Sequence, residues 1–136
     1  MNRPKILVAD RDKNILSAFS NYLRKKNYSM TGVSNVSDGL EKIRRQNFNL
    51  LITDVRVDSE FGKDFIIKAK DVQKDLPIIA ITSYPDKISE SDLKICGANC
   101  LFVKPLEIGK LDKAIESCLQ LNSLTKKEST NNNREL

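Results

Sequence analysis

The sequence has 136 residues, of which 40% are hydrophobic and 30% charged, and no internal stretch is rich in Pro, Gly or Ser. These values indicate one globular domain that buries a core without disulfide or metal links, and they exclude a largely disordered chain. The formal net charge is +5, but the basic residues form short clusters near predicted helix ends, without a zinc-finger, recognition-helix or RNA-stacking motif. We therefore expect no specific contact with nucleic acid.

Five short apolar runs predict five strands. They cover residues 5–9, 28–33, 50–53, 77–82 and 100–103. Four of the runs are too short and too uniformly apolar for amphipathic helices. The second run is more polar, which suits a strand at the edge of a sheet.

Segments with helical spacing of apolar residues separate the runs. The stripe of Ile15, Phe19 and Leu23 predicts a helix over about 12–26. The further helices are predicted after a cap at Ser34 or Ser37, around Phe65, Ile66, Ala69 and Val72, between Ser89 and Gly97, and over about 107–121. Strands that alternate with helices in this way predict an α/β fold, a (βα)5 doubly wound five-stranded parallel sheet with helices on both faces.

The chain is expected to divide into a domain over residues 1–121 and a polar, disordered tail over 122–136, because the tail offers almost no apolar residue to bury. No stretch is apolar enough to span a bilayer or to serve as a signal peptide. Cys96, Cys100 and Cys118 are odd in number and lack zinc-site spacing, so reduced thiols are expected. These features predict a cytoplasmic protein without a membrane contact.

Polar side chains follow four of the five predicted strands. Asp10 follows the first, Asp54 the third, Thr82 ends the fourth, and Lys104 follows the fifth. A polar residue after a single strand is most often a helix cap or a loop residue. Because the carboxyl ends of parallel strands meet at one edge of the sheet, the four together predict a site there.

The residue types at this edge suit phosphoryl transfer. A carboxylate such as Asp54 attacks a phosphoryl donor only when the incoming negative charge is neutralised by groups already in place. Lys104 supplies a positive charge and Thr82 a hydroxyl donor. Asp10 is an acidic neighbour of the kind that holds Mg2+ beside a phosphoryl group.

Four segments resemble the signature segments of response-regulator receiver domains, in order and in spacing. They are residues 6–12 (ILVADRD), 50–57 (LLITDVRV), 78–83 (IIAITS) and 97–105 (GANCLFVKP). The resemblance covers about residues 5–121 and implies the flavodoxin-like (βα)5 fold. It also implies that Asp54 is the phosphoacceptor of two-component signalling, that Thr82 is the switch residue, and that Lys104 is the lysine before proline. A sensor histidine kinase or phosphotransfer protein would donate the phosphoryl group.

The acidic pair of the family is altered in this chain. The resemblance implies a Mg2+ site formed by Asp10, Asp54 and the backbone carbonyl of Arg56, but Arg11 stands where the family has a second acid. We expect this change to weaken or abolish Mg2+ binding. Arg11 either reaches Asp10 or Asp54 in place of a metal or points to solvent, and Asp12 either caps the first helix or serves as a substitute ligand.

One further residue and one loop depart from the family pattern, and two residues flank its site. Leu101 replaces the aromatic residue whose rotation reports phosphorylation, and the loop of residues 57–62 keeps only the final glycine of the family pattern. Arg56 and Tyr84 occupy positions that flank the phosphoryl group, where they either shield it or are ordinary surface residues.

Two functions remain open. In the first, Asp54 is phosphorylated and the face made by the fourth helix, fifth strand and fifth helix changes partners, including a second copy of the chain. In the second, the chain is a pseudo-receiver that binds partners without phosphorylation. In neither is it an enzyme beyond catalysing its own phosphorylation and dephosphorylation. A nucleotide-binding enzyme is excluded because no glycine follows the first strand, and the chain has no His for a hydrolytic triad.

Overall fold

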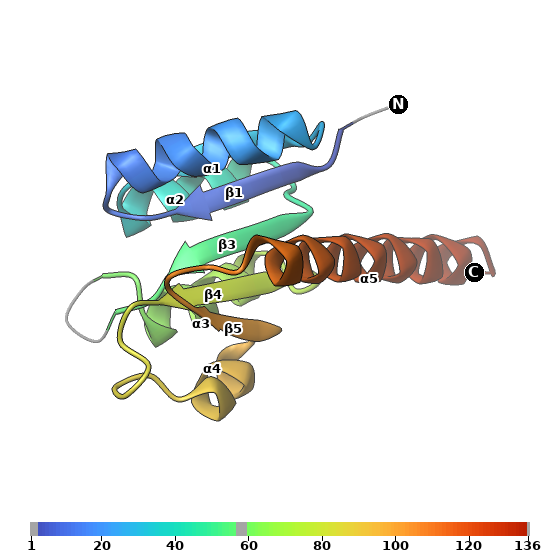
Figure 1. Ribbon diagram of the computed structural model, residues 1–136. Helices are drawn as coiled ribbons and strands as arrows, with labels where there is room; N and C mark the ends of the chain where they lie inside the picture. Colours follow the sequence, from blue (N-terminus) through green and yellow to red (C-terminus); the bar gives the residue numbers. More distant parts are fainter. Residues whose placement is uncertain (1–2, 57–59, 136) are drawn as a thin grey trace.

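The computed structural model describes residues 3–56 and 60–135, with side chains as far as Ser123, and shows strands and helices in strict alternation (Figure 1). The strands are β1 (Lys5–Ala9), β2 (Ser29–Val33), β3 (Leu50–Asp54), β4 (Ile78–Thr82) and β5 (Cys100–Val103). The helices are α1 (Lys13–Lys25), α2 (Val36–Arg45), α3 (Lys63–Val72), α4 (Glu90–Cys96) and α5 (Ile108–Glu135). The predicted (βα)5 order is confirmed.

The strands form one parallel sheet in the order β2-β1-β3-β4-β5. Ala9 lies opposite Thr53, and Thr82 lies opposite Val103. This register brings the carboxyl ends of β1, β3, β4 and β5 to the same edge. The chain runs from β1 outward to β2 and then returns to β3, so a crevice opens between the ends of β1 and β3.

The helices cover both faces of the sheet and enclose two apolar clusters. On one face α1 and α5 pack over alternate strand residues such as Ile6, Ile52 and Ile79 (Figure 1). On the other face α2, α3 and α4 pack over the intervening residues, among them Leu7 and Leu51. Alternate side chains of a strand point to opposite faces, so a sheet buried on both sides requires nearly continuous apolar strands, as β1, β3 and β4 are.

Short polar motifs set the ends of the helices. Asp12 caps α1, because its side chain accepts a hydrogen bond of 2.8 Å from the amide of Asn14. Ser89 caps α4, and Gly97 ends it with φ 124°, a conformation that suits glycine. The predicted cap of α2 was wrong. Asn35, rather than Ser34 or Ser37, caps α2, because it is the last residue with an extended backbone before the helix. Its side chain accepts a hydrogen bond from the amide of Asp38.

The three cysteines are free, in agreement with the expected reduced thiols. Burial against the α5 side of the sheet raises the pKa of Cys118 to about 11, so this thiol stays protonated at neutral pH. Within the part of the chain that the structure describes, no helix is long and apolar enough to cross a membrane.

The C-terminal segment over 122–136 is predicted from the sequence to be a disordered tail. The helix α5 continues without a break from Ile108 to Glu135. Asn122, the first residue assigned to the tail, is only 2% exposed; its amide donates to the carbonyl of Asp75 at 3.3 Å and accepts from Asn49 at 3.0 Å. Apolar patterning missed this docking because it is made by the side-chain amide of Asn122, which hydrogen-bonds to the Asn49 side chain and to the Asp75 carbonyl.

Replacing Asn122→Ala should lower the unfolding free energy by about 1 to 2 kcal/mol, because it leaves the Asn49 amide and the Asp75 carbonyl without their partner. Urea unfolding measures this loss. Ser123→Ala, at the next and exposed position, is the matched control and should have little effect. Deleting residues 124–136 should leave the melting temperature nearly unchanged, and a loss as large as that of Asn122→Ala would contradict this assignment of the docking to Asn122.

Candidate functional site

Two carboxylates lie side by side at the crevice. Asp54 is the last residue of β3 and Asp10 directly follows β1, and they are 3% and 4% exposed. Their backbones are held by the sheet, since the Asp10 amide donates to Val33 and the Val55 amide donates to Ile81. Burying two negative charges is costly unless each is paired and hydrogen-bonded, so the surroundings of these oxygens decide the chemistry of the site.

Lys104 bridges the two carboxylates from the end of β5. Its Nζ lies 3.4 Å from Asp54 Oδ1 and 3.5 Å from Asp10 Oδ2. Its backbone amide donates to the Thr82 carbonyl at 2.8 Å, and the peptide bond to Pro105 is cis. Burial raises the pKa of Asp10, and the nearby Asp54 charge adds to this, whereas the Asp12 amide and Lys104 partly offset both.

Arg56 binds the remaining side of Asp54. Its Nε lies 3.1 Å from Asp54 Oδ2, and its guanidinium carbon lies 6.0 Å from the centre of the Tyr84 ring. Its backbone amide donates to the Phe61 carbonyl at 2.8 Å. Although burial lowers the pKa of Arg56, the charge of Asp54 and its hydrogen bond more than offset this, so the pKa is raised and the side chain stays positively charged.

Thr82 completes the rim at the end of β4, where it is fully buried. Its Oγ1 accepts a hydrogen bond of 3.0 Å from the amide of Tyr84. Thr82 is thereby linked to the loop that carries the Tyr84 ring. The structure thus gathers Asp10, Asp54, Lys104 and Thr82 at one edge of the sheet.

Arg11 does not take the place of a metal. Its side chain is exposed, and among residues 3–56 and 60–123 no ion pair joins it to Asp10 or Asp54. The backbone after Asp10 turns back at Asp12, whose amide donates to Asp10 Oδ1 at 2.8 Å. Arg11, between these two residues, is exposed. Asp12 itself caps α1. The arginine that pairs with Asp54 is instead Arg56, which joins Lys104 on this carboxylate and forms an ion pair that the sequence patterns did not predict.

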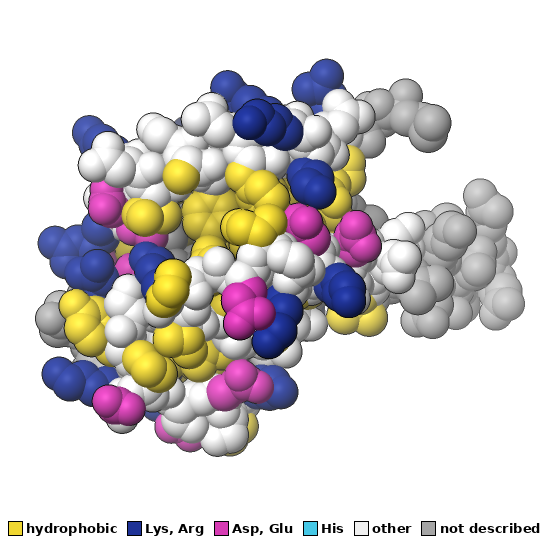
Figure 2. All heavy atoms as spheres, viewed as in Figure 1, with side chains coloured by type: hydrophobic (Ala, Val, Ile, Leu, Met, Phe, Trp, Pro, Cys, Tyr) yellow, Lys and Arg dark blue, Asp and Glu magenta, His cyan; other side chains and the backbone are white. Residues whose placement is uncertain are grey.

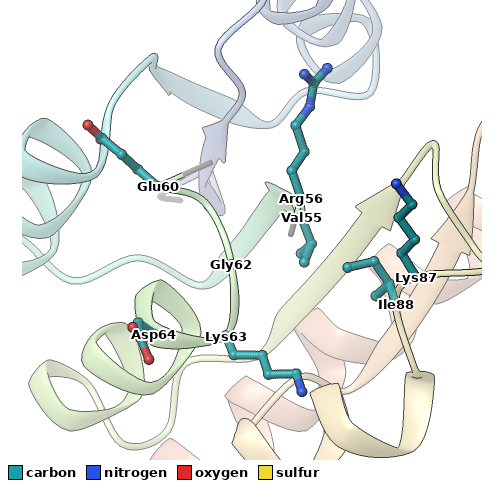
Figure 3. A pocket seen from close by; sticks show the side chains of 8 residues that line it. All are labelled: Val55, Arg56, Glu60, Gly62, Lys63, Asp64, Lys87 and Ile88. Carbon is teal, nitrogen blue, oxygen red and sulfur yellow. The ribbon is translucent and has the colours of Figure 1, made fainter. Parts of the chain in front are cut away.

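A pocket of about 350 Å3 adjoins the site between the start of α3 and the loop before α4. Figure 3 shows its lining, which is Val55, Arg56, Glu60, Gly62, Lys63, Asp64, Lys87 and Ile88. In this view the Arg56 side chain extends away from Lys63, and its Nε contacts Asp54. The expected change of shape in the loop of residues 57–62 falls partly on 57–59, which lie outside the described residues.

The donors at the crevice suit a hard divalent ion but are few. Asp10 and Asp54 offer carboxylate oxygens, and Mg2+ in proteins is held by one or two carboxylates while it keeps several waters. Within the described residues no group of three or more acidic, His or Cys side chains forms a metal cluster. The two carboxylates therefore fit Mg2+. They supply fewer anionic ligands than a site in which two adjacent acids follow β1 and a third acid ends β3.

Comparisons with known proteins identify the fold and the family. The family model of the response regulator receiver domain matches residues 6–116. The chain belongs to the response regulator receiver domains. It is 25% identical over 134 residues to the response regulator protein PilR of Pseudomonas aeruginosa, which covers 98% of this chain and 30% of that protein. The chain spans 26% to 54% of the length of the first curated relatives.

Solved receiver domains share the architecture. A CheY-like receiver domain protein from Methanospirillum hungatei superimposes with a TM-score of 0.81 at 24% identity, covering 91% of this chain and 99% of that one. The response regulator TrrA from Thermotoga maritima, solved in complex with Mg2+ and beryllofluoride, has a TM-score of 0.75 at 26% identity, covering 85% of this chain and 99% of that one. Members of this family are signalling modules of two-component systems rather than classical enzymes.

An aliphatic residue occupies the position of the aromatic side chain whose rotation reports phosphorylation in the family. Leu101, on β5, is partly buried against the cluster under α2, α3 and α4. The neighbouring Phe102 packs against the opposite cluster, under α1 and α5. A rotation like that of an aromatic ring is therefore not available to residue 101, as the sequence predicts.

Replacing Lys104→Met should destabilise the fold by about 2 kcal/mol, because the Lys104 bridge between Asp10 and Asp54 is lost and two carboxylates are left close together in a buried site. Adding Asp10→Asn should recover part of the loss, since one of the two charges is then absent. Urea unfolding of the single and double variants measures both effects. A double variant less stable than Lys104→Met would show that the carboxylates do not repel one another.

Proposed function

We propose that this receiver accepts a phosphoryl group on Asp54 from a sensor histidine kinase or phosphotransfer protein and thereby changes its partner binding. The observation that carries the proposal is the setting of Asp54. Its carboxylate closes a central strand in the crevice between β1 and β3, and each of its oxygens faces a cation of the chain, Lys104 on one side and Arg56 on the other. A nucleophile approached by a phosphoryl group needs this kind of preplaced positive charge.

The transfer uses groups that are already in place. A carboxylate oxygen of Asp54 forms a bond to phosphorus as the bond from phosphorus to the donor's histidine nitrogen breaks. Lys104, beside Oδ1, is placed to neutralise the phosphoryl oxygens, and the hydroxyl of Thr82 is placed to donate to one of them once it leaves the Tyr84 amide. Mg2+, held by Asp10, Asp54 and the backbone carbonyl of Arg56, would supply further charge neutralisation when bound.

The readout surface is the face made by α4, β5 and α5. Ile95 on α4 is 84% exposed, and Val103 and Ile108 are about half exposed at the end of β5 and the start of α5. Apolar side chains gather near the carboxyl ends of β4 and β5 (Figure 2). Exposed apolar side chains on neighbouring elements suit a protein partner or a second copy of the chain. Thr82 reaches this face through β4, which pairs with β5 along its length.

Free cysteines are consistent with a cytoplasmic location.

A second function, partner binding without phosphorylation, is favoured by one feature of the structure. Lys104 and Arg56 balance the charges of Asp10 and Asp54 before any metal or phosphoryl group arrives. A receiver that is neutral at rest has less need of Mg2+ to hold its carboxylates together. In this case the α4, β5 and α5 face would bind its partner equally well before and after treatment with a phosphodonor.

Treatment with acetyl phosphate, with and without Mg2+, should add the mass of one phosphoryl group to the intact chain. Asp54→Asn should abolish the addition because the acceptor oxygen is lost, whereas Asp86→Asn, at an exposed position of the loop before α4, should leave it unchanged. Intact-mass spectrometry of the three proteins provides the measurement. Equal labelling of wild type and Asp54→Asn would contradict the proposal, and the absence of labelling under all conditions would favour the second function.

A further inference from the structure

The four carboxylate oxygens of Asp10 and Asp54 are all engaged by groups of the chain. Lys104 takes one oxygen of each residue, the Asp12 amide takes the second oxygen of Asp10, and Arg56 takes the second oxygen of Asp54. Two negative and two positive side chains make the cluster neutral. A divalent ion entering this site therefore meets no net negative charge, and it competes with the existing partners for the oxygens.

Arg56 is the partner that is most open to displacement. Its side chain is 33% exposed, whereas Lys104 is more deeply placed between both carboxylates at 21%. The Asp12 amide is fixed by the backbone at the start of α1, since the Asp12 carbonyl and side chain bond the first turn of that helix. Only Arg56 binds a single carboxylate through a flexible side chain. Movement of Arg56 would thus free Oδ2 of Asp54 without unfolding any element.

Tyr84 holds Arg56 in this position. The guanidinium carbon lies 6.0 Å from the Tyr84 ring centre, a distance at which the ring attracts a cation. Tyr84 is 46% exposed, so its contact with Arg56 lies at the surface of the site. The amide of Tyr84 donates to Thr82 Oγ1. The residue that holds the cation in place is therefore bonded to the hydroxyl that the proposed phosphoryl transfer requires.

We propose that Arg56, positioned by Tyr84, is a built-in counter-cation of Asp54 that a divalent ion must displace in order to bind, and that Arg56 sets the metal affinity of this receiver. The inference rests on the proposed role of Asp54 as the acceptor site. It assigns to Arg56 the effect that the sequence suggests for Arg11. The distinction is testable because Arg56 is in contact with Asp54, whereas Arg11 is exposed and has no ion pair with either carboxylate.

Isothermal titration calorimetry with MgCl2 tests the proposal on the full chain. Arg56→Met keeps a long side chain but removes the charge and the Nε–H donor, so Mg2+ should bind about tenfold more tightly than to wild type, the order of effect expected for one unit charge at a partly exposed site. Arg11→Met is the matched control: the same charge is removed next to Asp10 but outside the ion-pair cluster, and the affinity should change less than threefold.

A second variant addresses the case in which Arg56→Met does not fold, as judged by circular dichroism. Tyr84→Leu leaves the Arg56 charge in place but removes the ring that holds it, so Mg2+ affinity should rise about threefold. Equal affinities of wild type and every folded variant of these two positions would overturn the proposal. A gain for Arg11→Met as large as the gain for Arg56→Met would also overturn it, because the effect would then be one of overall charge.

The outcome can be separated from that of the proposed function. Tighter Mg2+ binding by Arg56→Met without any labelling of Asp54 by acetyl phosphate would refute phosphorylation at Asp54 and leave the role of Arg56 intact. Labelling of Asp54 with unchanged Mg2+ affinity in Arg56→Met and Tyr84→Leu would refute the role of Arg56 and leave the proposed function intact.

Discussion

The site is governed by the burial of two carboxylates next to each other. Asp10 and Asp54 lie almost completely out of contact with water at the end of a central pair of strands. Carboxylates in such a position are tolerated only when positive charges and hydrogen-bond donors replace the lost hydration. This requirement explains why β5 is followed by a lysine, Lys104, that reaches back across β4 and β3. It also explains why the residue two positions after Asp54 turns its guanidinium back toward Asp54 rather than into solvent.

The same constraint connects the sheet to its loops. Lys104 reaches both acids because its backbone is bonded to Thr82 at the end of β4, which keeps the fifth strand in register with the others. Arg56 reaches Asp54 because its backbone is bonded to the Phe61 carbonyl before α3. A change at Asp54 therefore alters the contacts of the loop after β3, through Arg56, and of the residues that follow the edge strand β5, through Lys104.

Much of this arrangement could be predicted from the sequence. Parallel strands of apolar residues bring whatever follows them to one edge, so Asp10, Asp54, Thr82 and Lys104 could be placed together from their positions alone. The caps at Asp12 and Ser89 could also be predicted, because a short polar residue before an apolar stripe has a direct backbone partner.

The contacts that could not be predicted concern the direction of single side chains. Whether Arg11 or Arg56 faces Asp54 depends on how each loop turns after its strand, and sequence patterns carry no information on that turn. The cap at Asn35 was missed because Ser34 and Ser37, on either side of it, are also residue types that cap helices. The docking of Asn122 was missed because apolar spacing does not register a side-chain amide that bonds to a carbonyl of another segment. Spacing predicts which residues share an edge, whereas contacts between charged side chains follow from loop geometry.

A crystal structure of the chain grown with Mg2+ and beryllofluoride, a mimic of the phosphoryl group, tests the central claim most directly. The account predicts beryllofluoride on a carboxylate oxygen of Asp54, within reach of Lys104 and Thr82, Mg2+ beside it on Asp10 and Asp54, and the Arg56 guanidinium moved off Oδ2. A complex in which the mimic and the ion bind while Arg56 Nε stays at its present 3.1 Å from Asp54 Oδ2 would contradict it. Binding of the mimic at any residue other than Asp54 would contradict the assignment of the acceptor itself.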